Sequence, residues 1–371
     1  MKILHLIPGY GGGIGSIVQN LIVYSSSESV NHDIALFSCN NGEDFVKTIE
    51  KYHGHVYLMP RPKSDGIKAF VTYIRKLLLG NNYDVIHCHT FGIRAFLLKL
   101  LVKRYSNALF CVHAHRAAFD PNLLKNNFIY TKIEQFFSVK AADLKFACGK
   151  DASTFIFGDS SAVLIHNGVN TKQIYEARFT DKIDYCNSLG VNPRDCILLS
   201  VGRYTQQKNY PFLLDVAKGL MDRGFPFRLL AVGTGPLHEQ IKRKAHELKL
   251  DTHIMFLDRR LDVFNLMQIS DCLLLPSLYE GLPTVVVEAQ AMGLKSIVSN
   301  KITKETDLGL DIVEFLSIDS PDLWIKKIMS TNFDKVENFE KIDNVLEDQN
   351  YTGQTSANNY IKVLREALSQ N

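Results

Sequence analysis

The chain has 371 residues, of which 46% are hydrophobic and 22% are charged. This length favours two domains, or three, and the composition is typical of folded globular proteins; a single small binding module, a disordered chain and a low-complexity repeat are excluded. Lys and Arg total 42 against 39 Asp and Glu, a formal net charge of +3. This balance excludes a protein whose main task is to coat nucleic acid.

The seven cysteines form no CxxC pair, so we expect small buried side chains in a reducing compartment. The start of the chain, MKILHLIPGYGGG, has no basic n-region and no small-residue cleavage site, so no secretion signal is expected. The longest apolar stretch, 96–102, is interrupted by Lys99 and is far shorter than the ~20 residues of a membrane span. These features predict a cytoplasmic protein that does not cross a bilayer.

Short apolar runs alternate with helix-length amphipathic segments through the first half of the chain. Such alternation predicts βαβ units, whose right-handed crossovers build a parallel sheet covered on both faces. The expected strands are residues 2–7, 33–38, 56–59, 85–88, 109–113 and 144–148.

The alternation pauses at His166-Asn167-Gly168-Val169-Asn170, where Asn-Gly is a turn signal, and restarts after a polar stretch ending near Asp195. The expected second-half strands are residues 196–201, 228–232, 254–256, 272–275 and 296–298, with helices at 211–223 and 236–248 between them. We therefore predict an α/β protein with two Rossmann-like domains, 1–166 and 167–350, and a C-terminal helix in 351–371 that packs back on the first domain. Parallel sheets bind ligands beyond the carboxyl ends of their strands, so the two domains are expected to face each other across a cleft.

A glycine-rich loop, Gly9 to Gly15, follows the first expected strand and opens a helix. Its bare amides at a helix start suit a phosphate or another anion, although a merely flexible turn is the alternative. The loop does not match GxGxxG, because Ile14, Ser16 and Val18 stand where glycines would be required. Nicotinamide dinucleotide binding is therefore not supported.

A basic loop, GRYTQQKN, follows the first strand of the second half. Arg203 offers a planar fork for phosphate oxygens and Lys208 a compact charge, so together they could neutralise a diphosphate. Two basic loop residues can equally be solvated without a ligand.

The acidic segment Pro276 to Ala289 is the most informative motif. Pro283 is expected to be the first residue of a helix that Gly293 ends, so that Glu280 lies in the preceding loop and Glu288 in the second turn. The two carboxylates can then reach opposite ends of one elongated ligand, with the helix-start amides directed at an anion between them. Glu280 could otherwise be an ordinary surface acid.

Together GRYTQQKN, the EGLP…E segment, the glycine loop and the HNGVN linker resemble glycosyltransferase family 4, whose members have the GT-B fold. The resemblance covers essentially the whole chain. The segment from Glu288 to Gly309 is most similar to the branch that builds bacterial capsular and exopolysaccharide repeat units.

This resemblance implies a retaining hexosyltransferase that uses a nucleotide diphosphate sugar, expected to be a UDP-sugar. It implies that Arg203 and Lys208 hold the diphosphate, Glu280 contacts the hydroxyls of the donor sugar, and Glu288 binds the ribose. The implied acceptor is a saccharide or an undecaprenyl-linked saccharide. The full set of expected site residues is Glu280 and His113 at the transferred sugar, with Gly12, Gly13, Arg203, Lys208, Gly281, Leu282, Pro283, Thr284 and Glu288 on the donor.

In relatives a histidine after a strand of the first domain contacts the donor sugar. His113 and His115 are both candidates here, and the spacing to the strand favours His113. Relatives in this branch often have a Glu two positions after the glycine pair, where this chain has Gly15. Any contact which that Glu makes is therefore in question here.

No metal cofactor is expected, because the chain has no Asp-x-Asp pair and the basic residues and helix start would have to stabilise the leaving group. The pairs His87 with His89 and His53 with His55 could imitate a metal site, but neither pair has a third Cys or carboxylate ligand nearby.

A nucleotide-sugar 2-epimerase of the same fold and a non-catalytic nucleotide-sugar binding protein are the alternative functions. The presence of Arg203, Lys208 and both glutamates argues against a non-catalytic binding protein. The pairing of GRYTQQKN with the EGLP…E segment favours sugar transfer over epimerisation. Lys68, Arg75 and Lys76 lie on one expected helix. They could place the protein peripherally at the inner face of the cell membrane, or simply form a solvated helix face.

Overall fold

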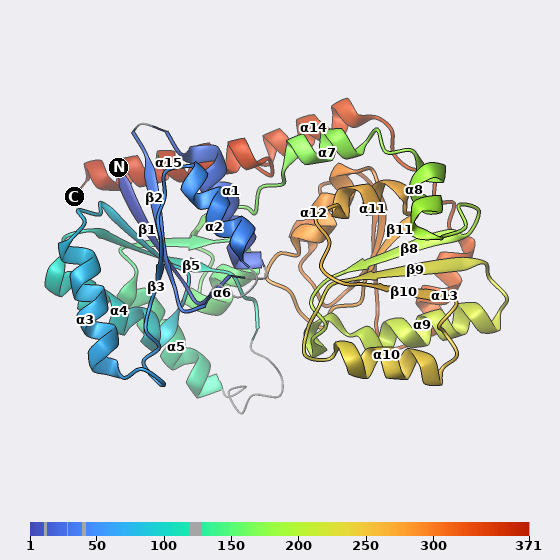
Figure 1. Cartoon of the computed structure of the whole chain (residues 1–371), viewed down its shortest axis with the longest axis horizontal. Coiled ribbons are helices and arrows are strands. Elements are labelled where there is room, and N and C mark those ends of the chain that lie inside the picture. The colour runs from blue at the N-terminus through green and yellow to red at the C-terminus, as the bar shows by residue number, and fades with distance from the viewer. Residues whose placement is uncertain (11–12, 28, 39–41, 119–127, 371) are drawn as a thin grey trace. The chain divides into compact units, whose positions relative to one another are not determined.

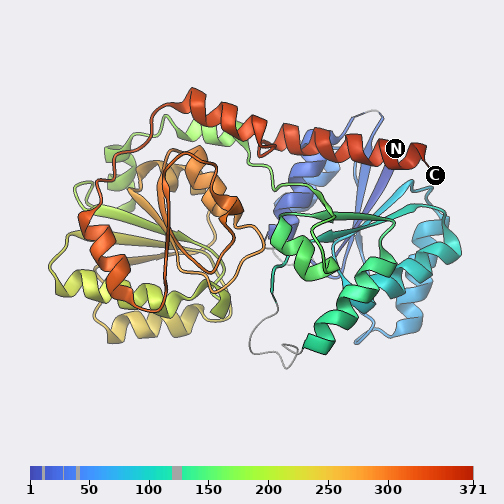
Figure 2. The same cartoon turned by 180° about the vertical axis from the view of Figure 1, so that it is seen from behind.

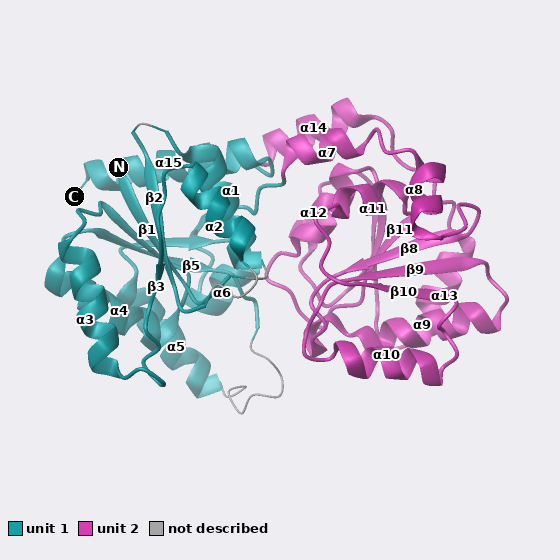
Figure 3. Cartoon of the chain, in the orientation of Figure 1, with its two compact units in different colours: residues 1–169, 350–371 teal, residues 170–349 magenta. Residues whose placement is uncertain are grey.

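The computed structural model describes residues 1–10, 13–27, 29–38, 42–118 and 128–370. The chain forms two compact units: unit 1 comprises residues 1–169 with 350–371, and unit 2 comprises 170–349 (Figure 3). The chain passes into unit 2 within the HNGVN segment and returns at Asn350, so the C-terminal segment belongs to unit 1.

Unit 1 contains a seven-stranded parallel sheet in the order β3-β2-β1-β4-β5-β6-β7, with helices between consecutive strands (Figure 1). Most of its strands are nearly continuous apolar runs because both faces of the sheet are covered. The elements are β1 (Lys2–Ile7), α1 (Gly13–Ser25), β2 (Asn31–Leu36), α2 (Glu43–Lys51), β3 (Val56–Leu58), α3 (Ile67–Leu79), β4 (Val85–Cys88), α4 (Gly92–Tyr105), β5 (Leu109–Ala114), α5 (Phe128–Ala141), β6 (Leu144–Ala147), α6 (Lys150–Phe157), β7 (Val163–Leu164) and α15 (Gly353–Ser369).

Helix α15 runs beside α1 in both views of the chain (Figure 1 and Figure 2). Its apolar positions Ala357, Tyr360 and Leu364 are buried against Ile3 and Leu21 in one core cluster. The spacing of these three residues is that of one helix face. The last helix of the chain thus completes the core of the first unit.

Two close backbone crossings fix the point where the chain leaves and rejoins unit 1. The amide of Val169 donates to the carbonyl of Tyr351 at 2.7 Å, and the amide of Gly353 donates to the carbonyl of Val169 at 3.0 Å. A Cβ on Gly168 would lie 2.7 Å from the Cα of Gly353. The Asn-Gly turn signal at the predicted boundary therefore has a packing reason, since no side chain fits at Gly168.

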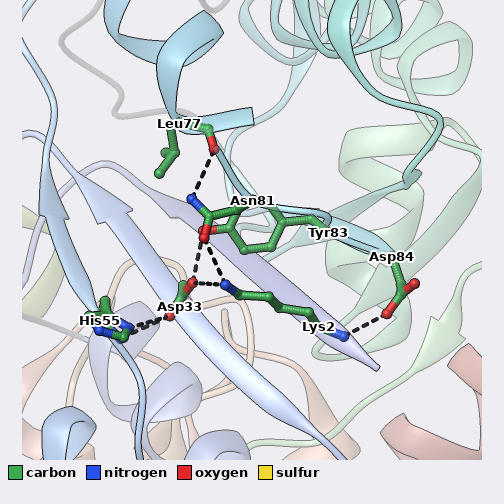
Figure 4. A network of polar contacts seen from close by, with 7 residues as sticks. All are labelled: Lys2, Asp33, His55, Leu77, Asn81, Tyr83 and Asp84. Carbon is green, nitrogen blue, oxygen red and sulfur yellow. Dashed lines mark hydrogen bonds and ion pairs between the residues drawn. The ribbon is translucent and has the colours of Figure 1, made fainter. Parts of the chain in front are cut away.

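A buried carboxylate ties the amino-terminal edge of this sheet together (Figure 4). Asp33 accepts hydrogen bonds from the Tyr83 hydroxyl at 2.8 Å and the His55 amide at 2.9 Å, and its Oδ2 lies 3.3 Å from the Nζ of Lys2. Lys2 in turn donates to Asn81, and its backbone amide donates to Asp84. These contacts satisfy a charge that would be costly to bury alone.

Unit 2 contains a six-stranded parallel sheet in the order β10-β9-β8-β11-β12-β13. Strand order reverses between β8 and β11, which makes their carboxyl ends the topological switch point. The elements are α7 (Thr171–Ala177), α8 (Lys182–Leu189), β8 (Cys196–Val201), η1 (Gln206–Lys208), α9 (Tyr210–Asp222), β9 (Phe227–Val232), α10 (His238–Glu247), β10 (Ile254–Leu257), α11 (Val263–Ile269), β11 (Cys272–Leu275), α12 (Thr284–Ala291), β12 (Lys295–Ser299), η2 (Lys304–Thr306), β13 (Val313–Leu316), α13 (Pro321–Ser330) and α14 (Phe339–Asp348).

The sequence analysis missed several elements of the two units, including helices α13 and α14. Strands β7 and β13 are short or only half-buried, and helices α7 and α8 lie in the stretch read as polar linker. Each of the two helices is capped by a side chain, Asn170 for α7 and Asp181 for α8. Strand β2 also begins two residues earlier than predicted, at Asn31.

No helix within the described ranges is both long and apolar enough to cross a bilayer. The six cysteines that lie within the described ranges are unpaired thiols, five of them buried, as expected of small core residues.

Candidate functional site

The basic loop and the acidic segment meet at the switch point of unit 2. Lys208 closes the short helix η1 after β8, and Glu280 lies in the loop after β11. The Nζ of Lys208 is 2.7 Å from the Oε1 of Glu280, and both side chains are largely buried. The neighbouring position of β8 and β11 in the sheet brings these two distant motifs together.

The Glu280 carboxylate has two further partners. The Ser277 hydroxyl donates to Oε1 at 2.8 Å, and the side-chain amide of Gln207 donates to Oε2 at 3.0 Å. Gln207 also donates to the carbonyl of Tyr279 at 2.9 Å, so it links the two loops independently of charge. Sequence reasoning did not assign a role to Gln207 or Ser277; their only signal was adjacency to Lys208 and Glu280.

Arg203 is placed differently from Lys208. Its side chain is exposed, and no acidic group in the described part of the chain forms an ion pair with it. The structure therefore joins Lys208 to Glu280 but leaves the Arg203 guanidinium directed to solvent. The exposed guanidinium of Arg203 is therefore available to bind an anionic ligand from solvent.

Glu288 lies in the second turn of α12, as predicted. Burial raises the pKa of its carboxyl to about 7, and the nearby charge of Lys208 acts in the opposite direction. At neutral pH this carboxyl can therefore be protonated, which lets it donate one hydrogen bond and accept another. Such a group suits a pair of sugar hydroxyls.

The start of α12 departs by one residue from the prediction. Pro283 is the N-cap, with φ −72° and ψ 96°, and Thr284 is the first helical residue. The extended ψ of Pro283 places it just outside the helix, because ψ rather than φ decides whether a proline continues helically. Gly281, Leu282 and Pro283 are buried and lead the chain into the helix from Glu280. Gly293 ends the helix with φ +65°, as expected.

Three glycines, none assigned in the sequence analysis, bring the loops of this edge close together. A Cβ on Gly202 would lie 2.8 Å from the Cε of Lys208, so the lysine stem crosses directly over the backbone there. A Cβ on Gly233 would lie 2.1 Å from the carbonyl oxygen of Gly202, and one on Gly235 would lie 2.5 Å from that of Tyr204. The glycines of Val-Gly-Thr-Gly after β9 are the sequence signal for this approach.

In unit 1 the glycine loop is only partly described. Gly12 lies outside the described residues, and Gly13 is the first residue of α1 with open space around its Cβ position. At Gly15 a Cβ would lie 3.1 Å from the Cδ2 of Tyr10, whose ring stacks on Phe45 with centroids 4.4 Å apart. The Tyr10 ring occupies space beside the position where relatives often have a glutamate.

His113 lies on β5 and is 1% exposed, while His115 follows the strand and is partly exposed. Their rings stack with centroids 4.1 Å apart. Burial lowers the pKa of His113 well below 6.5, with nearby histidines acting in the same direction, and burial lowers that of His115 to about 3. Both rings are therefore neutral at pH 7.

Histidines from neighbouring strands lie close to His87 and His89, which the sequence analysis did not predict. The nitrogens of His87 and His89 can be grouped with that of His5, and those of His113 and His115 with that of His89, each set within 4.8 Å. The sequence alone does not show this because the residues come from separate strands. The other pair, His53 and His55, belongs to neither group.

Comparisons with known proteins agree with this architecture. Residues 11–173 match the model described as Glycosyltransferase Family 4, and residues 181–308 match Glycosyl transferases group 1. The chain is 28% identical to EpsF of Bacillus subtilis (strain 168) over 335 residues, which cover 88% of this chain and 86% of EpsF.

Two further relatives have more specific names. The chain is 27% identical over 284 residues to UDP-Gal:alpha-D-GlcNAc-diphosphoundecaprenol alpha-1,3-galactosyltransferase of Escherichia coli, covering 71% of this chain and 70% of the relative. It is 24% identical over 305 residues to the amylovoran biosynthesis glycosyltransferase AmsD of Erwinia amylovora, covering 80% of each.

Two solved structures share the fold. A glycosyltransferase from Rickettsia africae ESF-5 has a TM-score of 0.75 and 19% identity, with 100% of this chain and 99% of that chain covered. Anabaena Alr3699/HepE in complex with UDP-glucose has a TM-score of 0.71 and 16% identity, with 100% and 98% covered. These two structures confirm the predicted GT-B fold, with two Rossmann-like units.

The two family models match residues in both units, and the three relatives named above cover 71% to 88% of this chain. The protein belongs to glycosyltransferase family 4, and its relatives include glycosyltransferases of exopolysaccharide biosynthesis.

Proposed function

We propose that the protein transfers a sugar, with retention of anomeric configuration, from a UDP-sugar to a saccharide or undecaprenyl-linked acceptor during assembly of an exopolysaccharide or capsule. Support comes from the family, from the named acceptor of the Escherichia coli relative, and from the UDP-glucose bound by the Anabaena neighbour. The observation that carries the proposal is the contact of Lys208 with Glu280 at the switch point, where a doubly wound sheet binds its ligand.

The charges at this edge suit a departing nucleoside diphosphate. The exposed Arg203 supplies a positive charge that is unpaired within the described residues, Lys208 supplies an ammonium that is also paired with Glu280, and the first turn of α12 adds the positive end of a helix dipole. Negative charge grows on the diphosphate as the bond to the sugar breaks, so cations fixed beforehand stabilise the transition state more than the bound donor.

Glu280 is proposed to contact the transferred sugar. Its carboxylate is already held by Ser277, Gln207 and Lys208, so little reorganisation is needed when the donor binds. An ordered carboxylate accepts hydrogen bonds from sugar hydroxyls and stabilises positive charge that develops on the ring. Glu288, whose carboxyl interacts electrostatically with Lys208, is proposed to bind the ribose.

We propose that no resident metal ion takes part. The fixed cations at the switch point can balance the charge of the leaving group, and the chain has no Asp-x-Asp pair.

A lipid-linked acceptor would require contact with a membrane, and the surface of unit 1 offers one. On α3 the basic residues Lys68, Arg75 and Lys76 are all exposed. The packed pair α4 and α5 presents exposed apolar side chains at helical spacing, with Lys132 over the ring of Phe128 and Lys140 over that of Phe136. These apolar side chains are Ile93, Leu97 and Leu100 on α4, and Ile129, Ile133, Phe136 and Val139 on α5. Apolar side chains flanked by lysines suit an anionic bilayer surface, so peripheral binding is proposed.

The function is tested by incubating the protein with a panel of nucleotide sugars and a lipid-linked saccharide, and by measuring nucleoside diphosphate release together with the anomeric configuration of the product by NMR. Acceptor-dependent release of UDP and an axial product from an axial donor support the proposal. A nucleotide sugar converted to its 2-epimer, or an inverted product, would overturn it.

Membrane binding is tested separately by flotation with anionic liposomes. Replacing Lys68, Arg75 and Lys76 together by Glu should abolish flotation, whereas Arg243→Glu with Lys244→Glu on unit 2 should not. Equal flotation of all three proteins would remove the proposal.

A further inference from the structure

Six histidines of unit 1 form one continuous layer on the face of the sheet that α1 and α15 cover. They come from four adjacent strands or from the residues just after them, and rings of successive members lie 4.1 to 5.6 Å apart. Five of them are at most 3% exposed. The six are His5, His32, His87, His89, His113 and His115.

Burial lowers the pKa of every one of these six imidazoles, so all are neutral at pH 7. A neutral imidazole has one N–H donor and one lone-pair acceptor. Each hydrogen bond between two rings therefore fixes the tautomer of one ring once that of its neighbour is known. Two such chains of hydrogen bonds run through the layer.

The first chain begins at Ser25, the last residue of α1. Its hydroxyl donates its one proton to the carbonyl of Leu21, so it must accept from the Nε2 of His32, 2.8 Å away. The Nδ1 of His32 is then a lone pair that accepts from the Nε2 of His5 at 3.0 Å. Ser25 thereby sets the direction of the whole chain.

The same logic continues to the end of the first chain. The Nδ1 of His5 accepts from the Nε2 of His89 at 3.1 Å, and the Nδ1 of His89 accepts from the Nε2 of His115 at 2.8 Å. The remaining nitrogen, Nδ1 of His115, is a buried lone pair that has no hydrogen-bond partner among the described residues. The first chain ends on an unused acceptor.

The second chain begins at Tyr360 on α15, which is fully buried and has a pKa raised well above 10 by burial, so it keeps its proton. Its hydroxyl lies 2.8 Å from the Nδ1 of His87, its one hydrogen-bond partner among the described residues. A buried O–H without an acceptor is costly, so the hydroxyl donates and the Nε2 of His87 carries the proton. That N–H donates to the Nδ1 of His113 at 3.2 Å. The Nε2–H of His113 is then a buried donor with no partner in the described part of the chain.

We propose that Ser25 and Tyr360 are positioning residues that fix the tautomers of the stacked pair His113 and His115. In these tautomers His113 offers an N–H donor and His115 offers a lone-pair acceptor. Together the two rings suit the hydroxyl groups of a saccharide. A hydroxyl group accepts from one nitrogen and donates to the other, whereas a phosphate or carboxylate oxygen would meet a lone pair at His115. The assignment of this pair to a sugar rests on the proposed function; the tautomers do not.

A metal ion bound by these histidines would require a larger distance between the ligating nitrogens. Two nitrogens on a tetrahedral zinc ion at about 2.05 Å are about 3.3 Å apart. The Nδ1 of His89 and the Nε2 of His115 are 2.8 Å apart, which is a hydrogen-bond distance. The geometry of this pair therefore favours a shared proton over a shared metal.

The tautomers can be read in the full-length protein labelled with 15N-histidine, by long-range 1H–15N correlation without any substrate, with signals assigned from single His→Gln variants. We expect one tautomer at each site: Nε2–H at all six histidines. The Tyr360→Phe variant should leave His87 and His113 as a mixture of tautomers while His32, His5, His89 and His115 stay unchanged. The Ser25→Ala variant should do the reverse. A control, Tyr83→Phe, removes an equally buried hydroxyl that bonds to Asp33 and should change no histidine signal.

In kinetics, Tyr360→Phe should raise KM for the sugar substrate that meets His113 by about tenfold, the size of one net hydrogen bond, without changing the affinity for free nucleoside diphosphate. Adding the UDP-sugar alone or the saccharide acceptor alone to labelled protein shows which of the two shifts the His113 and His115 signals.

The proposal is overturned if His113 carries its proton on Nδ1, if Tyr360→Phe behaves as Tyr83→Phe does, or if the purified protein holds one equivalent of metal. If the tautomers are as expected but neither saccharide shifts the two signals, the sugar assignment fails. In that case UDP release in the transfer assay shows whether the proposed function itself survives.

Discussion

Acidification is expected to destabilise unit 1 selectively, because its sheet buries neutral histidines. His32 is fully buried on β2, and burial lowers its pKa from 6.5 to about 3 even though the charge of the adjacent Asp33 acts to raise it. In the unfolded chain this histidine is protonated below pH 6.5. The unfolded chain therefore binds more protons than the folded protein, and the free energy of unfolding falls as the pH falls.

The magnitude follows from the gap between the two pKa values. Each pH unit below 6.5 costs about 1.4 kcal/mol per histidine of this kind, so His32 alone costs about 2 kcal/mol at pH 5. The loss stops growing near pH 3, where His32 is protonated in the folded protein as well. His5, His87, His89 and His113 act with the same sign. The loss of stability in unit 1 between pH 6.5 and 5 should therefore exceed the ~2 kcal/mol that comes from His32 alone.

Glu288 in unit 2 acts in the opposite direction. Burial raises the pKa of Glu288 from 4.5 to about 7, so the folded protein holds a proton that the unfolded chain releases above pH 4.5. Stability from this group is therefore gained as the pH falls from 7 to 4.5. The two units thus give an internal comparison within one molecule.

Native-state hydrogen exchange between pH 7.5 and 5.5, corrected for the intrinsic exchange rate, resolves the two units. Amides of β1, β4 and β5 should lose protection as the pH falls, whereas those of β8 and β11 should not. Replacing His32 by Gln should remove about 1.4 kcal/mol of the change in unfolding free energy between pH 7.5 and 5.5, because that range includes one pH unit below 6.5. Unchanged protection of β1, β4 and β5, or an unchanged pH dependence in His32→Gln, would refute the reasoning.

Four further outcomes are expected at the switch point. Arg203→Ala and Lys208→Ala should each lower kcat/KM by ~10²-fold with the fold intact, as judged by urea unfolding, and near-native activity of either variant would exclude it from the diphosphate. Glu280→Gln should lower turnover while leaving the affinity for nucleoside diphosphate nearly unchanged, whereas Glu288→Gln should mainly weaken that affinity. Turnover and calorimetric binding are measured on both variants, and the reverse pattern would mean that the donor binds in the opposite orientation. EDTA should leave activity in place, and a complete loss restored by magnesium would contradict the metal-independent proposal. Gly233→Ala should lower stability by about 1 to 3 kcal/mol in urea unfolding, because φ is +140° and the new Cβ would press on the Gly202 carbonyl, and a neutral effect would mean that the two loops do not meet.

Much of the fold followed from local pattern. The runs Lys2–Ile7, Val85–Cys88, Cys196–Val201 and Cys272–Leu275 were predicted at the bounds that the structure has, because buried parallel strands are continuous apolar segments flanked by polar turns. Short capped helices such as α7 were not predicted, because one or two helical turns with few apolar residues show no clear hydrophobic periodicity. The one-residue error at Pro283 arose because a proline fixes φ but not ψ.

The candidate site divides in the same way. Arg203, Lys208, Glu280 and Glu288 were found from motif and spacing, which depend only on neighbours along the chain. The roles of Gln207 and Ser277 were not predicted, because their contacts with Glu280 depend on β8 and β11 lying side by side.

The histidine layer shows most plainly what each level decides. Alternation along a strand already predicts that His87 and His89 share a face, as His113 and His115 do, because the side-chain period of a strand is two. That His5 and His32 join them was decided only by the strand order β2-β1-β4-β5, and that Tyr360 reaches His87 only by the return of α15 to unit 1. The type and buried face of most of the longer strands and helices were thus determined by the sequence through short-range sterics and hydrophobic periodicity. Which side chains meet was decided by the tertiary structure, since strand order and chain return depend on burying all the apolar faces at once.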